Sequence, residues 1–242
     1  MARNPVHPLG MMSFPLRPFL AASAGAYFLV QSGWRKAHEL EWAQSYKAPI
    51  PVISVGNIAM GGTGKTPFVM YLVQRLVERG LKPCVISRGY RGSYATDYVV
   101  VSDGLSIVPK VDVKLVGDEP FLMATNLMDK APLVVGKDRL KCIEFVHNNF
   151  SCDLAVLDDG FQHLKLKRDL DIVLLSGRED RMFPVGILRE PISAITRADI
   201  IIMAADQEFM SKKLHDFLAF REYYTYRSHA VDLIGRDTLT KK

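Results

Sequence analysis

Residues 49 to 66 place an apolar, β-branched run directly before a glycine-rich loop and a Lys-Thr pair. The run ends at Val55, and the pair Lys65-Thr66 opens a stretch with helical spacing. A phosphate-binding loop needs this order, because glycines let backbone N–H groups turn toward phosphate oxygens and the helix N-terminus adds partial positive charge. The stretch therefore predicts a site for a nucleoside triphosphate.

The loop departs from the G-x-x-x-x-G-K-[ST] template at one position, where Ala59 stands in place of the first glycine. Lys65 is expected to reach the β- and γ-phosphates, and the Thr66 hydroxyl to ligate Mg²⁺. The alternative is a glycine turn before a surface helix that carries Lys-Thr by chance. We assign ATP binding to Ala59, Met60, Gly61, Gly62, Thr63, Gly64, Lys65 and Thr66.

Apolar runs alternate with helical patterns along the rest of the chain. Because several runs are continuously apolar, they favour an α/β fold with a parallel sheet covered on both faces. With 242 residues, the chain is long enough for one large α/β core. Helices are expected at 65–78, 120–127, 140–150 and 209–217, and strands at 83–87, 97–101, 133–135, 154–157, 172–175 and 200–203.

The chain carries a modest basic excess, a formal net charge of +5. This charge is compatible with an anionic partner, and by itself it does not choose among nucleotide, phospholipid and nucleic acid. The three cysteines, Cys84, Cys142 and Cys152, lack the spacing of metal ligands, so we expect free thiols, mostly buried.

The N-terminal region contains an uncharged apolar segment, Phe19 to Val30, which Trp34, Arg35 and Lys36 follow. Twelve helical residues span about 18 Å, short of a bilayer core of about 30 Å. An apolar stretch with a basic flank is typical of a helix that lies in a membrane interface. The alternative is a helix packed on the protein's own core.

Carboxylates follow the expected strands at two places. Asp158-Asp159 comes directly after the strand at 154–157, the arrangement that holds Mg²⁺ beside a phosphate loop; an acidic turn is the alternative. Asp118-Glu119 stands at the start of a helix, where it serves either as a cap or as a general base. Arg88, Arg139, Arg189 and Lys165 are candidates to stabilise a transferring phosphoryl group, or else are solvated surface cations.

Five motifs, taken together, resemble the tetraacyldisaccharide 4'-kinase family, which phosphorylates a lipid A precursor in Gram-negative bacteria. They are Val55-Gly56-Asn57 with Gly61–Pro67, Ser87-Arg88-Gly89-Tyr90, Val116-Gly117-Asp118-Glu119-Pro120, Asp158-Asp159-Gly160-Phe161-Gln162-His163 and Leu188-Arg189-Glu190-Pro191.

The resemblance implies a P-loop NTPase-like fold, with a mostly parallel sheet and helices on both faces. It also implies transfer of the ATP γ-phosphate, with Mg²⁺, to the 4'-hydroxyl of a tetraacyldisaccharide 1-phosphate, giving lipid IVA. It implies an acylated glucosamine disaccharide as partner, no nucleic acid, and a peripheral position at the cytoplasmic face of the inner membrane. By the same resemblance Asp118 becomes the catalytic carboxylate, assisted by Lys65, Arg139 and Arg189. Metal ligation is expected from Thr66, Asp158, Asp159 and Glu190.

The expected organisation is a membrane-associating segment at 1–48, a kinase core at 49–220 and the start of a shortened C-terminal subdomain at 221–242. The family's Gly-Ile-Gly-x-Pro-x-Arg-Phe-like and Asp-His-His segments do not occur in this sequence, and His229 does not match the latter. Two alternatives therefore stay open. One is an inactive nucleotide-binding homologue; the other is a division-site or plasmid-partition switch ATPase, although Met60 stands where those carry a signature lysine.

Overall fold

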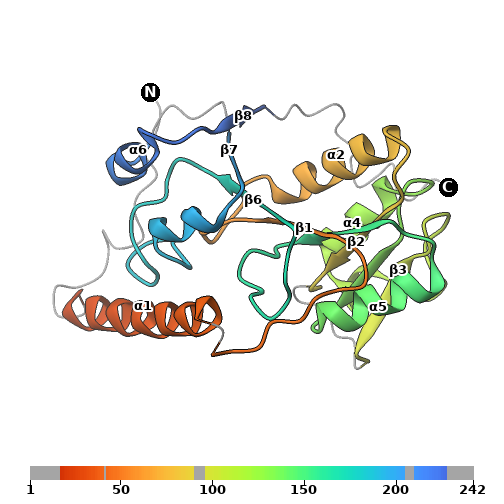
Figure 1. Cartoon of the computed structure of the whole chain (residues 1–242), viewed down its shortest axis with the longest axis horizontal. Helices are drawn as coiled ribbons and strands as arrows, with labels where there is room; N and C mark the ends of the chain where they lie inside the picture. The colour runs from red at the N-terminus through yellow and green to blue at the C-terminus, as the bar shows by residue number, and fades with distance from the viewer. Residues whose placement is uncertain (1–16, 41, 90–95, 205–209, 228–242) are drawn as a thin grey trace.

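One sheet organises the residues that the computed structural model describes, 17–40, 42–89, 96–204 and 210–227 (Figure 1). Its strands are β1 (Val52–Gly56), β2 (Pro83–Ser87), β3 (Tyr98–Ser102), β4 (Leu133–Gly136), β5 (Leu154–Asp158), β6 (Leu170–Leu175), β7 (Ile200–Ala204) and β8 (Tyr224–Tyr226). They lie in the order β3-β4-β2-β5-β1-β6-β7-β8. All neighbours pair in parallel except β3 and β4, which are antiparallel. The predicted α/β fold with a mostly parallel sheet is confirmed.

The helices are α1 (Arg17–Glu39), α2 (Lys65–Glu78), α3 (Val113–Val116), α4 (Asp118–Asn126), α5 (Arg139–Asn149), the 3₁₀ helix η3 (Ile192–Arg197) and α6 (Lys212–Leu218). The helix expected at 209–217 begins only at Lys212, because the Ser211 hydroxyl caps it by accepting a hydrogen bond from the Leu214 N–H at 3.3 Å. Residue 209 lies outside the described residues.

Strand β8 was not expected from the sequence. Its three residues pair with β7, so they extend the core sheet beyond the boundary predicted at residue 220. The run Tyr223-Tyr224-Thr225-Tyr226 is short and partly exposed, and such a segment gives little periodic signal. The division of the chain into three parts stays a prediction.

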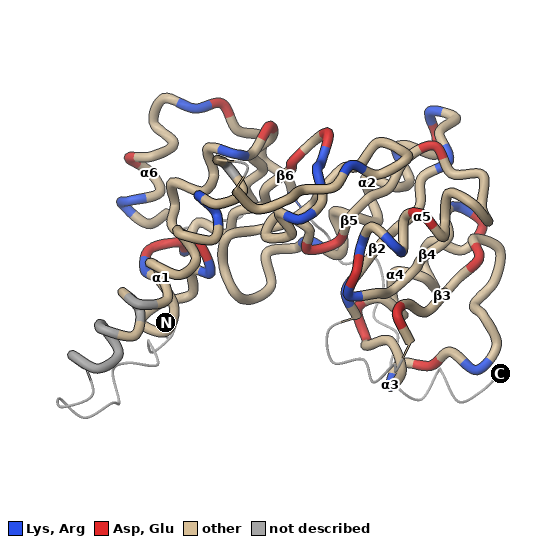
Figure 2. Tube along the Cα trace, turned by 60° about the horizontal axis from the view of Figure 1, so that its bottom comes forward, with Lys and Arg blue, Asp and Glu red and all other residues tan. Residues whose placement is uncertain are grey.

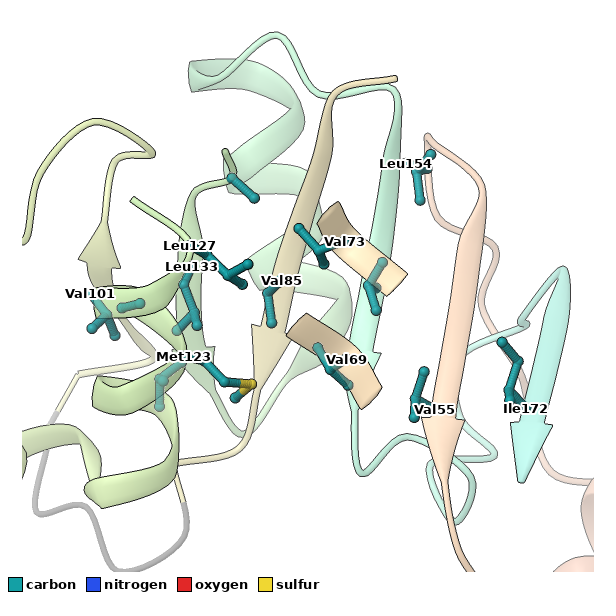
Figure 3. Packing of buried hydrophobic residues seen from close by; sticks show 14 of the residues in the cluster. Val55, Val69, Val73, Val85, Val101, Met123, Leu127, Leu133, Leu154 and Ile172 are labelled. Carbon is teal, nitrogen blue, oxygen red and sulfur yellow. The ribbon is translucent and has the colours of Figure 1, made fainter. Parts of the chain in front are cut away.

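Both faces of the sheet are covered by apolar side chains. On one face, Val69 and Val73 of α2 and Met123 of α4 pack over strand residues such as Val55 and Val85 (Figure 3). The alternate strand residues face α5 at one half of the sheet and η3 and α6 at the other. This two-sided burial explains the continuous apolar runs in the sequence. The free thiols of Cys84 and Cys142 are buried as predicted, while Cys152 is half-buried.

Helix α1 lies at the edge of the body and is uncharged from residue 18 to residue 34 (Figure 2). Its exposed apolar side chains include Phe28, Leu29, Val30 and Trp34. Within the described ranges, no helix has both the length and the apolar content needed to cross a bilayer.

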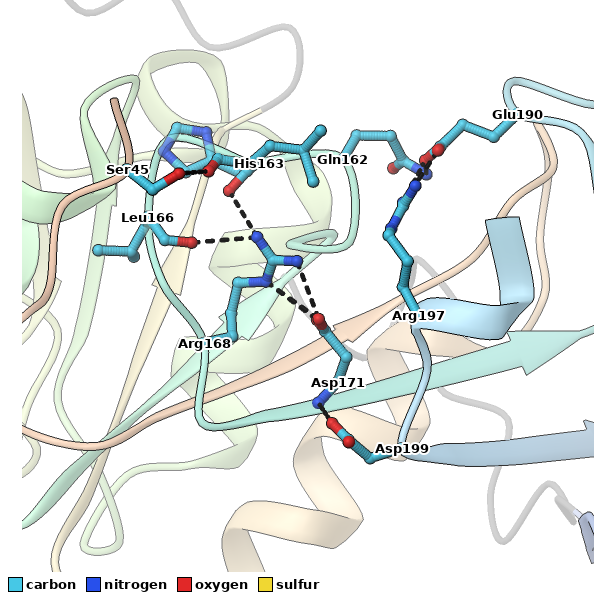
Figure 4. A network of polar contacts seen from close by, with 10 residues as sticks. Ser45, Gln162, His163, Leu166, Arg168, Asp171, Glu190, Arg197 and Asp199 are labelled. Carbon is cyan, nitrogen blue, oxygen red and sulfur yellow. Dashed lines mark hydrogen bonds and ion pairs between the residues drawn. The ribbon is translucent and has the colours of Figure 1, made fainter. Parts of the chain in front are cut away.

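A buried ion pair fixes the segment between β5 and β6 (Figure 4). Arg168 donates from Nη2 to Asp171 Oδ2 at 2.8 Å, and from Nη1 to the carbonyls of His163 at 3.1 Å and Leu166 at 3.0 Å. The two charged side chains are only 9% and 10% exposed. One guanidinium thus folds residues 163–168 back onto the start of β6 and positions the loop that enters the site.

Replacing Arg168 by Met should lower the free energy of unfolding by about 3–5 kcal/mol, because the Asp171 carboxylate stays buried without its cation. Arg75→Met, at the exposed pair with Glu78, is the matched control and should change it by less than about 1 kcal/mol. Urea unfolding followed by circular dichroism measures both. Equal effects of the two variants would contradict a structural role for the buried pair.

Candidate active site

A cleft of about 1180 Å³ opens where the parallel strands end at their carboxyl termini. The phosphate loop forms one wall and α1 contributes Tyr27, Gln31 and Trp34 to another. The remaining lining comes from strand ends, helix starts and the loops that follow β5 and β6: Ser87, Arg88, Glu119, Pro120, Lys137, Arg139, Asp158, Asp159, Gln162, His163, Leu164, Lys165 and Arg189. Segments far apart in the sequence therefore meet at one polar site.

The phosphate loop has the backbone geometry that its glycines allow. Gly61 and Gly64 have φ values of 106° and 74°, a region that disfavours other residues, and Lys65 is the first residue of α2. Ala59 is buried and forms an isolated antiparallel bridge with Leu188. Ala59 needs no left-handed backbone, which explains why a glycine is not required there.

The paired aspartates lie beside the loop because β5 runs parallel to β1, with Asp158 opposite Val55. Asp159 receives two cations: Lys65 Nζ is 3.4 Å from Oδ1 and Arg189 Nη1 is 2.9 Å from Oδ2. Asp158 is buried and accepts a hydrogen bond from Ser87 Oγ at 3.0 Å. The structure therefore brings Lys65, Arg189 and the two carboxylates together.

The two carboxylates differ in electrostatic environment. Burial, followed by the neighbouring charge of Asp159, raises the pKa of Asp158 to about 6. Burial also acts to raise the pKa of Asp159, but Lys65 and Arg189 outweigh it and the net pKa is lowered. Asp159 is thus held charged, while Asp158 takes up a proton readily when no cation balances it.

The site fits a divalent cation at Asp158. Its Oδ1 is buried and accepts no hydrogen bond from any described residue, so one carboxylate lone pair is available for a metal or its water. No cluster of three His, Cys, Asp or Glu side chains suited to a metal occurs in the described part of the chain. Mg²⁺ usually takes one or two carboxylates and completes its shell with water and phosphate oxygens, which agrees with this arrangement.

Glu190 is not among the described residues that line the cleft, whereas the paired aspartates are. Its carboxylate is buried, pairs with Arg197 Nη2 at 2.9 Å and accepts from Gln162 Nε2 at 2.9 Å (Figure 4). Gln162 also donates to the carbonyl of Asn57 at 2.7 Å. These contacts favour a role in holding the loops together over the metal ligation expected from the sequence.

Asp118 is the first residue of α4 and is exposed. Its neighbours Glu119 and Pro120 line the cleft, whereas Asp118 is not among the described residues that do so. Arg139 is buried at the start of α5, donates to the Lys137 carbonyl at 3.2 Å and lines the cleft, and burial lowers the pKa of its guanidinium. Among the cations named from sequence, Arg88 and Lys165 also lie there.

Gln162 and His163 belong to the Asp158–His163 motif, and no role for either follows from the sequence alone. Both line the cleft. Burial, then Arg139 and Arg168, lowers the pKa of His163 to about 4, so its imidazole is neutral at neutral pH. A neutral ring offers both a hydrogen-bond donor and an acceptor, suited to a hydroxyl-bearing ligand. The signal in the sequence is their position, four and five residues after Asp158, the last residue of β5.

Comparison with known families identifies the family to which the chain belongs. The model of the family described as "Tetraacyldisaccharide-1-P 4'-kinase" matches residues 16–236. The chain belongs to this family. A tetraacyldisaccharide 4'-kinase of Halothermothrix orenii is 44% identical over 170 residues, which is 68% of this chain and 43% of that protein. One from Aquifex aeolicus is 43% identical over 184 residues, 73% of this chain and 56% of that protein.

A solved member of the family shares the fold. The crystal structure of LpxK from Aquifex aeolicus in complex with ATP superposes with a TM-score of 0.74 and 35% identity, covering 88% of this chain and 64% of that one. The chain spans about half the length of the curated relatives it matches. Family membership does not favour the switch-ATPase alternative.

Asp158 and His163 should give the metal-free protein opposing pH dependences. A carboxyl whose folded pKa is raised contributes stability below its unfolded pKa that is lost as pH rises through about 6. An imidazole whose folded pKa is lowered contributes stability to the folded protein that is lost as pH falls from 6.5 toward 4.

Asp158→Asn isolates the first contribution. The free energy of unfolding of the parent should fall by about 2–3 kcal/mol between pH 4 and pH 7 through this carboxyl, and the variant should lack that fall. Chemical unfolding in EDTA at stepped pH measures it, and Asp153→Asn, at a more exposed carboxyl far from the cleft, is the control. A parent and Asp158→Asn variant with parallel pH profiles would contradict the raised pKa.

Proposed function

We propose that this protein is an ATP-dependent kinase that transfers the γ-phosphate to the 4'-hydroxyl of a tetraacyldisaccharide 1-phosphate, forming lipid IVA in lipid A biosynthesis. The observation that carries the proposal is the convergence of Lys65 and Arg189 on Asp159, beside the buried Asp158 and the phosphate loop. The acceptor named in the family's description and the ATP complex of the solved relative support it.

The loop residues 59–66 would bind the ATP phosphates through backbone N–H groups and the N-terminus of α2. Lys65 would exchange its contact with Asp159 for the β- and γ-phosphates, and Arg189 would stabilise charge on the transferring group. Because both cations already lie in the cleft, little reorganisation is needed.

Thr66, Asp158 and Asp159 would hold Mg²⁺, which neutralises charge on the phosphate oxygens. Asp158 would supply its unpaired Oδ1, and Ser87 would keep that carboxylate oriented. We place Glu190 outside this set because Arg197 and Gln162 occupy its carboxylate.

On the acceptor side, Asp118 would accept the proton of the attacking hydroxyl, with Arg139 helping to bind phosphate or substrate. Asp118 begins α4, and the adjacent Glu119 lines the cleft. Either carboxylate fits a general base by position, so the experiment must separate the two.

Transfer from γ-labelled ATP to the tetraacyldisaccharide 1-phosphate tests the activity. Asp118→Ala should lower kcat by about 10²–10⁴-fold if it is the base. Lys65→Met should lower it by about 10²–10³-fold through lost charge stabilisation.

Glu119→Ala is the matched control for Asp118→Ala and should retain most of the activity. If only Glu119→Ala abolishes transfer, the base is assigned wrongly. If the wild type binds ATP but yields no labelled lipid, the alternative of an inactive homologue is supported. If it hydrolyses ATP without labelled lipid, the switch-ATPase alternative is supported.

We further propose that residues 1–48 bring the protein to the cytoplasmic face of the inner membrane through α1. A many-tailed lipid rarely leaves the bilayer, so the cleft must approach it. Tyr27, Gln31 and Trp34 line the cleft, while Leu29 and Val30 are 70% exposed on the same helix. Helix α1 thus carries both exposed apolar side chains and residues that line the cleft.

Leu29→Glu should weaken binding to vesicles of anionic and zwitterionic phospholipids about tenfold, because a charge replaces an apolar side chain that would enter the membrane. Deleting residues 1–35 should abolish binding. Leu105→Glu, at a side chain 75% exposed on the loop after β3, is the control. Vesicle sedimentation measures all three, and co-sedimentation of the deletion variant would refute the membrane role.

A further inference from the structure

The last described strand reaches the phosphate loop from across the sheet. In the strand order, β8 is separated from β1 by β6 and β7. Tyr226, the final residue of β8, nevertheless donates its hydroxyl to the backbone carbonyl of Thr63 at 2.6 Å. Its ring also meets Phe68 of α2 edge-on, with 6.3 Å between ring centroids.

Thr63 is therefore held from two directions. Its side-chain Oγ1 accepts from Asn57 Nδ2 at 2.9 Å, in a buried contact, while its carbonyl accepts from Tyr226. Asn57 follows β1 directly, so this contact ties the loop to the strand that carries it. The Tyr226 contact is different, because it comes from a segment 163 positions away.

The carbonyl contact determines where a neighbouring donor points. The Thr63–Gly64 peptide is trans, so its C=O and the N–H of Gly64 point in opposite directions. Holding the Thr63 oxygen on the Tyr226 side turns the Gly64 N–H the other way. Gly64 lines the cleft and precedes Lys65, where a phosphate-binding loop needs its amide donors.

The close approach of Tyr226 also accounts for the glycine at position 64. A Cβ there would collide with the Tyr226 hydroxyl, in addition to the strain of a φ of 74°. The loop glycine and the tyrosine thus form one packed contact.

We propose that Tyr226 is a positioning residue for nucleotide binding, whose hydroxyl orients the Thr63–Gly64 peptide so that the Gly64 N–H faces the ATP phosphates. The inference rests on the proposed binding of ATP at this loop. It concerns how the loop is held, and it does not depend on which acceptor receives the phosphate.

Tyr226→Phe tests it by removing one hydroxyl and keeping the ring against Phe68. We expect the Kd for Mg²⁺-ATP, measured by titration calorimetry on the whole chain, to rise about three- to tenfold, the worth of one oriented hydrogen bond. Tyr224→Phe, at a side chain 65% exposed on the same strand, should leave Kd unchanged.

Phe68→Leu separates positioning from stability. It weakens the aromatic packing around Tyr226 but keeps the hydroxyl, so it should lower the melting temperature and leave the ATP Kd near the parent value. Hydrogen exchange of loop amides in the absence of ATP should rise in Tyr226→Phe beyond any change in global stability. If the Kd values of both variants follow their melting temperatures, Tyr226 is merely structural and the inference is wrong.

The outcomes distinguish this inference from the kinase proposal. Tight ATP binding by the parent and unchanged binding by Tyr226→Phe overturns the inference alone. The expected rise in Kd without any labelled lipid product overturns the kinase proposal alone. A parent chain that binds no ATP contradicts both.

Discussion

The parallel pairing of β1 with β5 is the constraint on which the site depends. It sets Val55 opposite Asp158, so the strand that leads into the phosphate loop and the strand that ends in two carboxylates finish at the same level. A slip of one residue would turn Asp158 to the other face of the sheet. The register is held by alternating apolar residues: Val156 of β5 packs on the α2 side, and Ala155 and Leu157 pack on the α5 side. Apolar packing in the core thereby fixes how far Asp158 lies from the phosphate loop.

In that geometry the two neighbouring aspartates have different partners. Asp159 forms ion pairs with two cations, whereas Asp158 is desolvated, accepts from the Ser87 hydroxyl and forms no ion pair with any described residue. A buried unpaired carboxylate is costly, and the cost falls when a cation arrives. The same contacts hold Lys65 in the cleft while no phosphate is present. The arrangement is thus less stable than a fully paired one would be, and the proposed metal–phosphate ligand would relieve that cost.

Sequence patterns predicted the parts of this fold whose signals are local. The loop at 59–66, the aspartates after a four-residue apolar run and the helix at 65–78 each follow from a few adjacent residues. Three features could not be read this way. The short strand β8 lacks periodicity, the role of Glu190 depends on its partner Arg197, and the neutrality of His163 depends on burial and distant arginines. Each of these is decided by tertiary contacts.

The motifs that carried the family resemblance divide into chemical and supporting residues. Within Asp158–His163, the aspartates face the cleft, but Phe161 is buried under the Arg197 guanidinium, 4.4 Å from the ring centroid. Gln162 links Asn57 to Glu190, and Leu188 forms a bridge with Ala59, so residues of the last two motifs support the phosphate loop. Phe161, Gln162 and Leu188 therefore hold other residues in place. A rigid loop directs its amide donors before any phosphate arrives, which is the physical reason that a short glycine motif needs such an extended support.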